Sequence, residues 1–223
     1  THGGIEALVG VLTVARAGDA EPTDAERGAL GAFAALAAVA IDRARLGSMV
    51  TERSEWFERM AHTDPLTGLA NDRTFERILE LELARAARQG GEVSLALFDI
   101  DGLTETNAAA GHAAGDDVLR AVAAVLAESV RLVDTVARIG GDEFVLVAPG
   151  AAGTAVAQRV LDGIGALPAA GGRAISVSAG VARFPTDAGS ADDLKAAAQA
   201  ALEAARSAGR GVLAGPPRVA SEG

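Results

Sequence analysis

Apolar residues recur at two kinds of spacing along the chain, and each kind predicts a different element. Intervals of three and four residues predict helices over about 24–60, 71–88, 115–129, 154–164 and 191–207. Short apolar runs predict strands at 8–14, at 93–100, on both sides of Gly140-Gly141, and at 174–184. The Gly-Gly pair between two apolar runs indicates a hairpin, which joins antiparallel strands. This alternation predicts an α+β fold, a ferredoxin-like sandwich of helices on one sheet.

The first predicted helix is longer than a small domain is wide. Thr23 and Glu26 have the spacing of a capping box, and no proline follows until Pro65. About 35 helical residues span roughly 50 Å, so part of the helix should project and pair with a partner. A parallel two-stranded coiled coil through Leu30 to Met60, which would make a homodimer, is one use of its apolar positions. An amphipathic helix packed on its own domain is the alternative.

Length, charge and composition exclude several classes of protein. The 223 residues suffice for one ordinary domain and an appendage. With 20 Lys+Arg against 30 Asp+Glu, the net charge of −10 argues against binding of a nucleic-acid polymer through a basic surface. The absence of cysteine excludes disulfides and thiolate sites. No uncharged apolar run is long enough for a membrane span and no signal peptide is recognisable, so we expect a cytoplasmic protein with no membrane contact in this stretch.

Acidic side chains gather where two predicted strands should meet. Asp99 and Asp101 end the apolar run "VSLALFDI", and Asp142 and Glu143 lie on the hairpin turn. If the hairpin pairs beside that run, Asp99 and Asp142 converge and need a cation between them. Oxygen ligands without histidine favour Mg²⁺ or Mn²⁺ over zinc. The alternative is that the aspartates only cap the next turn and that Asp142 is an ordinary turn residue.

Several motifs together resemble one known family. "DPLTGLAN", "DID", "GHAAGD", "RIGGDEFVLV", "ISVSAGVA" and "ALEAARSAGR" follow one another between Thr63 and Val212. In this order and spacing they resemble the GGDEF domain of diguanylate cyclases, which implies a palm-type nucleotide cyclase fold behind a long signalling helix. The resemblance implies an enzyme that condenses two GTP into cyclic di-GMP and two pyrophosphates as a homodimer. The alternative is a catalytically weak or inactive GGDEF domain that signals by binding GTP or cyclic di-GMP.

The resemblance also implies a role for each acidic residue of the site. Asp99 and Asp142, with the carbonyl of Ile100, would hold Mg²⁺ or Mn²⁺. Glu143 lies beside these ligands and would assist deprotonation of the attacking 3′-hydroxyl. The catalytic and metal-binding residues are therefore expected to be Asp99, Ile100, Asp142 and Glu143.

Substrate-binding residues follow from the same resemblance. The backbone at Gly102, Leu103 and Thr104 would cradle phosphate oxygens. Arg206 and Arg210, four residues apart on the last predicted helix, would reach the β and γ phosphates. Asn107 and Asp116 match the pair that reads the donor edge of guanine. Without the resemblance, Asn107 and Asp116 could equally be helix N-caps.

The chain departs from the usual family pattern at a few positions near this site. Thr104 and Ala108 stand where lysine and aspartate are usual, Gln199 and Glu203 replace aspartate and tyrosine, and Arg206 replaces lysine. The change at Thr104 removes a positive charge beside the transferring phosphate, and such charges are often worth a few kcal/mol. These departures favour the binding-module alternative, whereas intact Asp99, Asp142 and Glu143 favour the enzyme.

Two further charged pairs suggest regulation. Arg131 and Asp134 form an R-x-x-D motif that five residues, 135–139, separate from Gly140, which resembles the spacing of the family's product-inhibition site for cyclic di-GMP. Alone, the same motif would be read as an ion pair on a helix surface. Asp64 and Arg138 resemble the contact that ties the entering linker to the GGDEF hairpin, although Asp64 could instead be a local N-cap.

The N-terminal part resembles the end of another domain. "GVLTVAR", a short acidic turn and "DAERGALGAFAALAAVAIDRARL" look like the last strand and helix of a GAF-like sensory domain. We therefore expect residues 1–45 to be the C-terminal part of a truncated GAF-like domain and residues 46–62 a signalling-helix linker. The GGDEF domain is expected at 63–215, followed by a disordered tail at 216–223.

Overall fold

The computed structural model describes residues 10–11, 13, 15, 21–170 and 172–216, and only the backbone of 46–60. The chain forms two compact units, Thr1–Glu58 and Arg59–Gly223. The strand expected at 8–14 lies largely outside the described residues, and its described members Gly10, Val11 and Thr13 are exposed and outside any strand. Nearly all of the tail expected at 216–223 also lies outside them.

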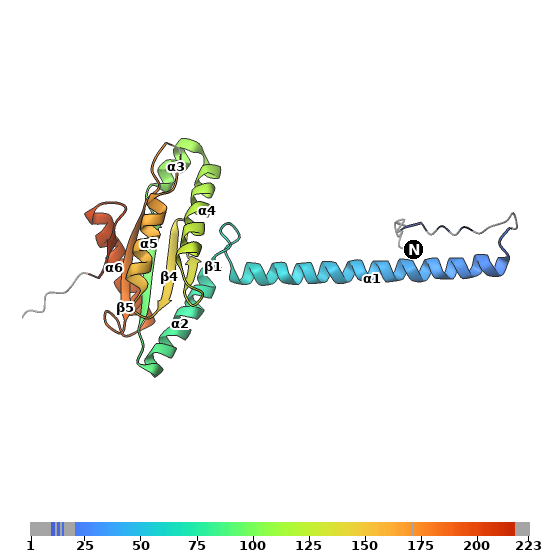
Figure 1. Ribbon diagram of the computed structural model, residues 1–223, viewed down its shortest axis with the longest axis horizontal. Helices are drawn as coiled ribbons and strands as arrows, with labels where there is room; N and C mark the ends of the chain where they lie inside the picture. Colours follow the sequence, from blue (N-terminus) through green and yellow to red (C-terminus); the bar gives the residue numbers. More distant parts are fainter. Residues whose placement is uncertain (1–9, 12, 14, 16–20, 171, 217–223) are drawn as a thin grey trace, which may run out of the picture. The chain divides into compact units, whose positions relative to one another are not determined.

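Helix α1 runs without interruption from Asp24 to His62 (Figure 1). The predicted capping box is present, because the Thr23 backbone N–H donates to Glu26 Oε2 at 2.7 Å and the Glu26 N–H donates to Thr23 Oγ1 at 3.3 Å. Apolar side chains at Leu30, Phe33 and Ile41 are exposed, Phe33 by 64%. Within the described residues, no helix combines the length and the apolar character that a bilayer crossing requires.

The second unit contains the remaining helices and strands. Its described helices are α2 (Asp72–Gln89), α3 (Leu103–Ala110), α4 (His112–Ser129), α5 (Gly153–Gly165) and α6 (Ala191–Ala208). Its described strands are β1 (Ala70–Asn71), β2 (Val93–Ile100), β3 (Thr135–Arg138), β4 (Glu143–Pro149), β5 (Val177–Phe184) and β6 (Leu213–Ala214). The pattern of the sequence predicted all of these except α3, β1 and β6, which are too short for a periodic signal.

The six strands form one mixed sheet in the order β1-β3-β4-β2-β5-β6. The predicted hairpin is confirmed, since β3 and β4 are antiparallel and flank Gly140-Gly141. Strand β2 is antiparallel to both β4 and β5, and Asp99 of β2 lies opposite Glu143 of β4. The central strands therefore have the ferredoxin-like order, which brings the end of β2 beside the hairpin turn.

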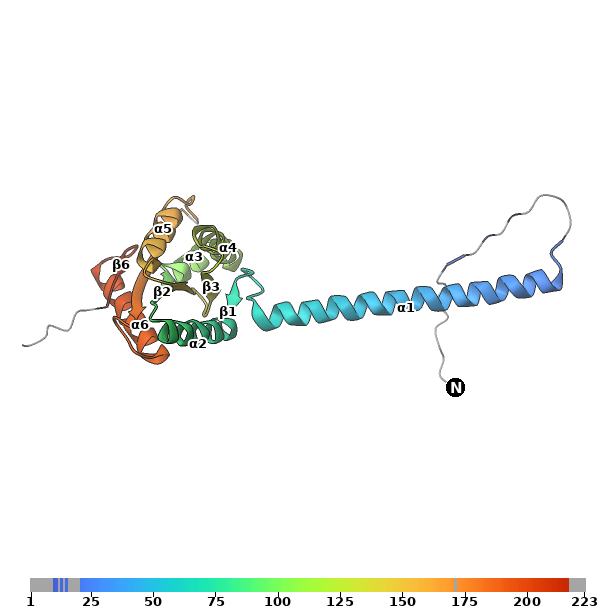
Figure 2. The ribbon, with the colours of Figure 1, turned by 60° about the horizontal axis from the view of Figure 1, so that its bottom comes forward.

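Helices cover both faces of this sheet (Figure 2). Phe98 and Ile100 of β2 pack in a core with α4 and α5, whereas Leu95 and Leu97 pack in a second core with α2 and α6. Because β2 is buried on both faces, its apolar run is continuous rather than alternating. Helix α6 lies so close to β5 that a Cβ atom on Gly180 would be 2.2 Å from the backbone N of Leu202.

Candidate active site

A polar cavity of about 350 Å³ opens at the end of strand β2. Three segments that are distant in the sequence form its wall: the β2–α3 connection, the β3–β4 turn, and the end of α6. The lining residues are Asp99, Ile100, Asp101, Gly102, Leu103, Thr104, Glu105, Asp142, Arg206 and Arg210. Most of the residues expected to bind metal and phosphate thus lie around one cavity.

Asp99 is the most buried acid of this cavity, with 8% of its surface exposed. The backbone N–H of Ile100 donates to the Asp142 carbonyl at 3.2 Å, which holds the hairpin turn against the end of β2. Burial raises the pKa of the Asp99 carboxyl, and the charges of Asp142 and Glu143 raise it further, although Arg206 opposes both effects. Negative charge is therefore crowded at the place where the sequence predicts a cation.

The residues at this edge fit a hard divalent cation by their chemistry. The carboxylates of Asp99, Asp142 and Glu143 offer only oxygen donors, as Mg²⁺ and Mn²⁺ prefer. In the part of the chain that is described, no three acidic or histidine side chains are already gathered at ligand distances. Instead, the carboxylate of Asp99 is paired with the guanidinium of Arg206. In this structure, the guanidinium of Arg206 therefore neutralises part of the buried negative charge of Asp99.

The two arginines of the cavity, Arg206 and Arg210, do not both belong to helix α6. Arg206 lies in the last turn of α6, and its Nη1 also contacts Glu203 Oε1 at 2.9 Å. Arg210 is not on this helix, because α6 ends at Ala208 and the chain turns at Gly209. The expectation that both arginines share one helix face is therefore wrong. Both line the cavity nevertheless, and Arg210 lies 3.9 Å from Glu105.

The cradle expected at Gly102 coincides with the start of helix α3. Gly102 is the N-cap of α3 and has a φ of +74°, a conformation that side-chain-bearing residues rarely adopt. The amides of Leu103 and Thr104 occupy the first turn, where N–H groups have no partner within the helix. Neither Asp99 nor Asp101 caps this helix, so the alternative that they are simple caps is wrong for both.

Asp101, in the connection between β2 and α3, is hydrogen-bonded to the β5 region and to the segment that follows α6. Its carboxylate accepts hydrogen bonds from Ser176 Oγ at 2.8 Å, Ser178 Oγ at 2.9 Å and the Gly211 N–H at 3.0 Å. The serines belong to the β5 region, whereas Gly211 follows Arg210. Sequence reasoning missed this role, because the partners of Asp101 lie 75 or more residues away and only the sheet brings them together.

Asn107 and Asp116 lie inside helices, so neither is an N-cap. Asn107 belongs to α3 and Asp116 to α4, whose N-caps are Gly102 and Gly111. The Oδ1 atom of Asn107 is buried and has no hydrogen-bond partner. It lies against Gly115, where a Cβ atom would be only 1.9 Å away. The unpaired Oδ1 atom of Asn107 therefore lies close to Gly115, the residue directly before Asp116.

The R-x-x-D segment forms a turn and not a helix-surface ion pair. Helix α4 ends at Ser129, and the Asp134 carboxylate accepts a hydrogen bond from the backbone N–H of Arg131 at 2.9 Å. Arg131 is exposed, and so are Leu132 and Val133 between the two charged residues. The alternative interpretation of this motif is therefore wrong, and the guanidinium of Arg131 faces solvent.

Asp64 and Arg138 contact each other as the sequence predicts. Arg138 Nη1 donates to Asp64 Oδ1 at 3.2 Å, and both side chains are less than one-fifth exposed. Arg138 also donates to the carbonyls of Gly140 and Gly141 in the hairpin turn. Burial tends to raise the pKa of Asp64, but hydrogen bonds from Thr67 and the charge of Arg138 outweigh it and hold that pKa below its ordinary value.

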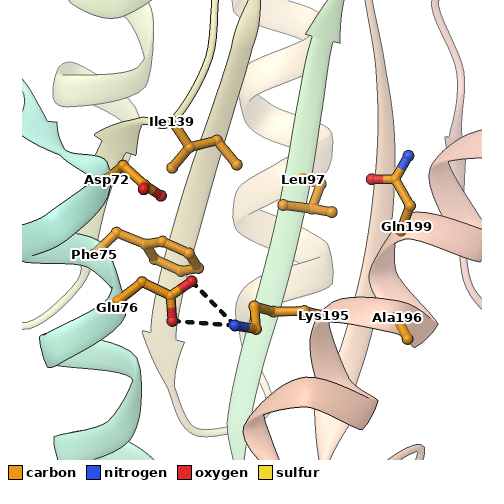
Figure 3. A pocket seen from close by; sticks show the side chains of 8 residues that line it. All are labelled: Asp72, Phe75, Glu76, Leu97, Ile139, Lys195, Ala196 and Gln199. Atoms are coloured by element: carbon orange, nitrogen blue, oxygen red, sulfur yellow. Dashed lines mark hydrogen bonds and ion pairs between the residues drawn. The ribbon is translucent and has the colours of Figure 1, made fainter.

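A second cavity of about 330 Å³ lies between α2 and α6. Phe75, Leu97 and Ile139 supply its apolar wall. Figure 3 shows Lys195 of α6 directed toward Glu76 of α2, with contacts of 3.0 and 3.1 Å to the two carboxylate oxygens. These hydrogen bonds raise the pKa of Lys195 above its ordinary value. The sequence pattern did not predict this tie between the two helices.

Comparison with known proteins identifies the second unit. Residues 61–212 match the family model described as "Diguanylate cyclase, GGDEF domain". The chain resembles the crystal structure of the coiled coil and GGDEF domain of DgcB from Caulobacter crescentus in complex with c-di-GMP. The TM-score is 0.66 at 31% identity, and the match covers 80% of this chain and 98% of that one.

Two curated relatives agree with this match. Diguanylate cyclase DgcP of Pseudomonas aeruginosa is 43% identical over 111 residues, or 48% of this chain and 16% of DgcP. The response regulator PleD of Caulobacter vibrioides is 32% identical over 183 residues, or 78% of this chain and 40% of PleD. The chain therefore spans less than half the length of either relative. It belongs to the diguanylate cyclase family of GGDEF-domain proteins.

Proposed function

We propose that this protein is a diguanylate cyclase, which condenses two GTP molecules into cyclic di-GMP and two pyrophosphates. The observation that carries the proposal is the cavity that joins Asp99 and Asp142 to Arg206 and Arg210. Carboxylates suit a divalent cation and guanidinium groups suit a triphosphate, so one cavity offers both halves of a metal–nucleotide site. The relatives named as diguanylate cyclases support the same activity.

In this proposal the acidic edge activates the attacking group. Asp99, Asp142 and the carbonyl of Ile100 would hold Mg²⁺ or Mn²⁺, the metals that the donor set favours. When bound, such an ion would increase the acidity of the 3′-hydroxyl and offset negative charge on the triphosphate. Glu143, opposite Asp99 in the sheet, would accept or relay the proton of that hydroxyl.

The remaining residues of the site would bind the nucleotide. The amides at Leu103 and Thr104, freed by the turn at Gly102, would donate to phosphate oxygens. Arg206 would exchange Asp99 for the β and γ phosphates, and Arg210 would bind them from the other side. The unused Oδ1 of Asn107 would accept from the guanine amino group, while Asp116 would accept from the remaining donor edge.

The same proposal requires two copies of the chain. Each 3′-hydroxyl must attack the α-phosphate of the other nucleotide, and one domain with one set of site residues holds one GTP. We propose a homodimer through the apolar stripe of α1, which would raise the effective concentration of the two sites. Residues 1–45 would then be the end of a GAF-like sensor, and the reaction would take place in the cytoplasm.

Arg131 and Asp134 would bind the product and limit its formation. The exposed guanidinium of Arg131 is free to pair with phosphate and stack on guanine. Arg131→Ala should therefore raise the cyclic di-GMP concentration needed for half-inhibition by about tenfold, with little change in initial turnover. Initial rates with added cyclic di-GMP measure both quantities. Equal inhibition of the variant and the wild type would contradict this assignment.

The test of the main proposal is direct. The wild-type chain with GTP and Mg²⁺ should produce cyclic di-GMP, detected by its mass, whereas Asp142→Asn and Glu143→Gln should produce at least about a hundredfold less. Both substitutions preserve side-chain size, so circular dichroism should show an unchanged fold. GTP binding without any product would contradict catalysis and favour a GGDEF domain that signals by binding alone.

A further inference from the structure

A third arginine approaches the phosphate cradle from a segment that the site described above does not include. The backbones of Arg173 and Ala170 are joined by two hydrogen bonds. The Ala170 N–H donates to the Arg173 carbonyl at 2.9 Å, and the Arg173 N–H donates to the Ala170 carbonyl at 3.0 Å. This segment precedes β5, which pairs with β2 along its whole length. This pairing carries Arg173 to the end of β2, where Gly102 begins helix α3.

The position of Arg173 is defined by its distance from Gly102. A Cβ atom on Gly102 would lie 3.5 Å from Oε2 of Glu105, 3.6 Å from Nη2 of Arg173 and 3.7 Å from Nη1 of Arg210. Two guanidinium groups from different parts of the chain therefore lie near Gly102, with the carboxylate of Glu105 beside them. A glycine with two cations beside it is well suited to the close approach of a phosphate group.

The three arginines near the cavity differ in the carboxylates with which their side chains interact. Arg206 is paired with Asp99 and Glu203, and Arg210 lies within reach of Glu105. Among the described residues, the side chain of Arg173 has no hydrogen-bond or ion-pair partner. It is exposed at the rim, and its charge is not neutralised by a carboxylate of the protein.

The charge of the cavity makes such a residue important. Its wall carries four carboxylates against two guanidinium groups, and Thr104 adds no charge. Before the charge of the proposed Mg²⁺ is counted, a triphosphate with a charge of roughly −4 would meet net repulsion from these side chains. Arg173 brings a further guanidinium group to the cradle at Gly102, in addition to that of Arg210.

We propose that Arg173 is a further phosphate-binding residue of this site, which contacts the triphosphate of GTP together with Arg210. This inference rests on the proposed function, because it takes the cavity to be the GTP site. It assigns the residue to binding of the triphosphate and not to the chemistry at the 3′-hydroxyl. The effect of Arg173 should therefore appear in nucleotide affinity.

The experiment measures binding without turnover. Isothermal titration calorimetry of the full chain with 3′-deoxy-GTP and Mg²⁺ reports affinity, because this nucleotide lacks the attacking hydroxyl. Arg173→Ala should weaken 3′-deoxy-GTP binding by about tenfold, whereas GMP, which lacks the outer phosphates, should lose much less. Thr104→Lys, added to Arg173→Ala, should restore most of the loss, since it returns a cation to the same rim.

Arg183→Ala is the matched control, because it removes the same charge at the other end of β5. In the pairing of β2 with β5, Arg183 lies opposite Ser94, far from the end of β2 where Ser178 lies opposite Asp99. The side chain of Arg183 pairs with Asp187 at 3.7 Å. Arg183→Ala should leave 3′-deoxy-GTP affinity unchanged. Unchanged affinity in Arg173→Ala, an equal loss in Arg183→Ala or an equal loss for GMP would overturn the inference. Cyclic di-GMP production by the wild type is assayed separately, so a protein that binds through Arg173 and makes no product would contradict only the catalytic proposal.

Discussion

Two aspartates two residues apart show how differently the fold treats the same side chain. Asp101 accepts three hydrogen bonds from Ser176, Ser178 and Gly211, so its charge is well satisfied. Asp99 is buried beside other carboxylates, and its pKa is raised. Asp101 therefore has the environment of a structural residue, whereas the charge of Asp99 is only partly compensated by Arg206, as is typical of a functional site.

Asn107 is a second residue of the site whose polar group is not fully compensated. A buried acceptor without a partner costs roughly 1–3 kcal/mol, and the Oδ1 atom of Asn107 is in this state. Natural proteins keep few such groups, and a ligand is one reason to keep them. Because this atom is buried against Gly115, a donor of the nucleotide would reach it after rotation of the Asn107 side chain.

Replacement of this residue should separate binding from stability. Asn107→Ala removes the unsatisfied acceptor, so the melting temperature of the nucleotide-free protein should stay equal or rise. Affinity for GTP should fall by about tenfold while the weaker affinity for ATP changes little, because adenine lacks the amino group at that edge. Calorimetry with both nucleotides and a thermal melt measure these quantities. A lower melting temperature with equal losses for GTP and ATP would show that Asn107 is only structural.

At the scale of elements, Arg138 connects the start of the second unit to the hairpin. It donates to Asp64 and to the carbonyls of Gly140 and Gly141, so it contacts both the segment that follows α1 and the GGDEF turn. The Arg138 side chain therefore joins the segment that follows α1 to the turn that carries Asp142. This physical contact is the basis on which a signal from the helix could reach the site.

The lowered pKa of Asp64 makes this contact dependent on pH. A group whose pKa is lower in the folded state stabilises the protein above its unfolded pKa, and this stabilisation is lost as the pH falls through the folded value. Asp64→Asn should therefore reduce the free energy of unfolding by about 1–3 kcal/mol at pH 7. The difference from wild type should shrink as the pH falls below about 4.

Urea titrations at several pH values check this prediction. Asp117→Asn is the control, because it breaks an ion pair with Arg120 in which Asp117 is 78% exposed. Exposed pairs contribute only about 0–1 kcal/mol, so this variant should differ little from wild type at any pH. A pH-independent difference for Asp64→Asn would mean that the charge of Asp64 does not stabilise the fold.

At the scale of the whole molecule, the exposed apolar residues of α1 bear on assembly. At about 100° per residue, Leu30, Phe33 and Ile41 fall within an arc of about 80°. All three are exposed in the single chain, Ile41 by 43%. Such a stripe is typical of a helix that pairs with a second helix.

Charges on this stripe should separate two copies of the chain. Phe33→Glu combined with Ile41→Glu should lower cyclic di-GMP production per chain by about tenfold or more at low protein concentration and recover part of it at high concentration. Val39→Glu, on another side of the helix, adds the same charge and should have no such effect. Activity and sedimentation measured over a dilution series test this. Activity per chain that does not change on dilution of the double variant would exclude this stripe as the dimer interface.

Local patterns in the sequence determined most of the elements and the family. Apolar patterns predicted α1 and eight of the other described elements, because buried faces repeat with the geometry of the element that carries them. The Gly-Gly turn predicted an antiparallel hairpin, since hairpin turns depend on neighbouring residues. Motif order then indicated the GGDEF domain and most residues that line the cavity.

Tertiary structure alone decided which distant groups meet. The pairing of β2 with β4 and β5 brings Asp101 to Ser176, Arg206 to Asp99, and Arg173 to Gly102. None of these contacts repeats along the chain, so no local pattern records them. Their geometry follows from the strand order and from the close packing of α6 on β5, which depend on the free energy of the whole fold and not on any single segment.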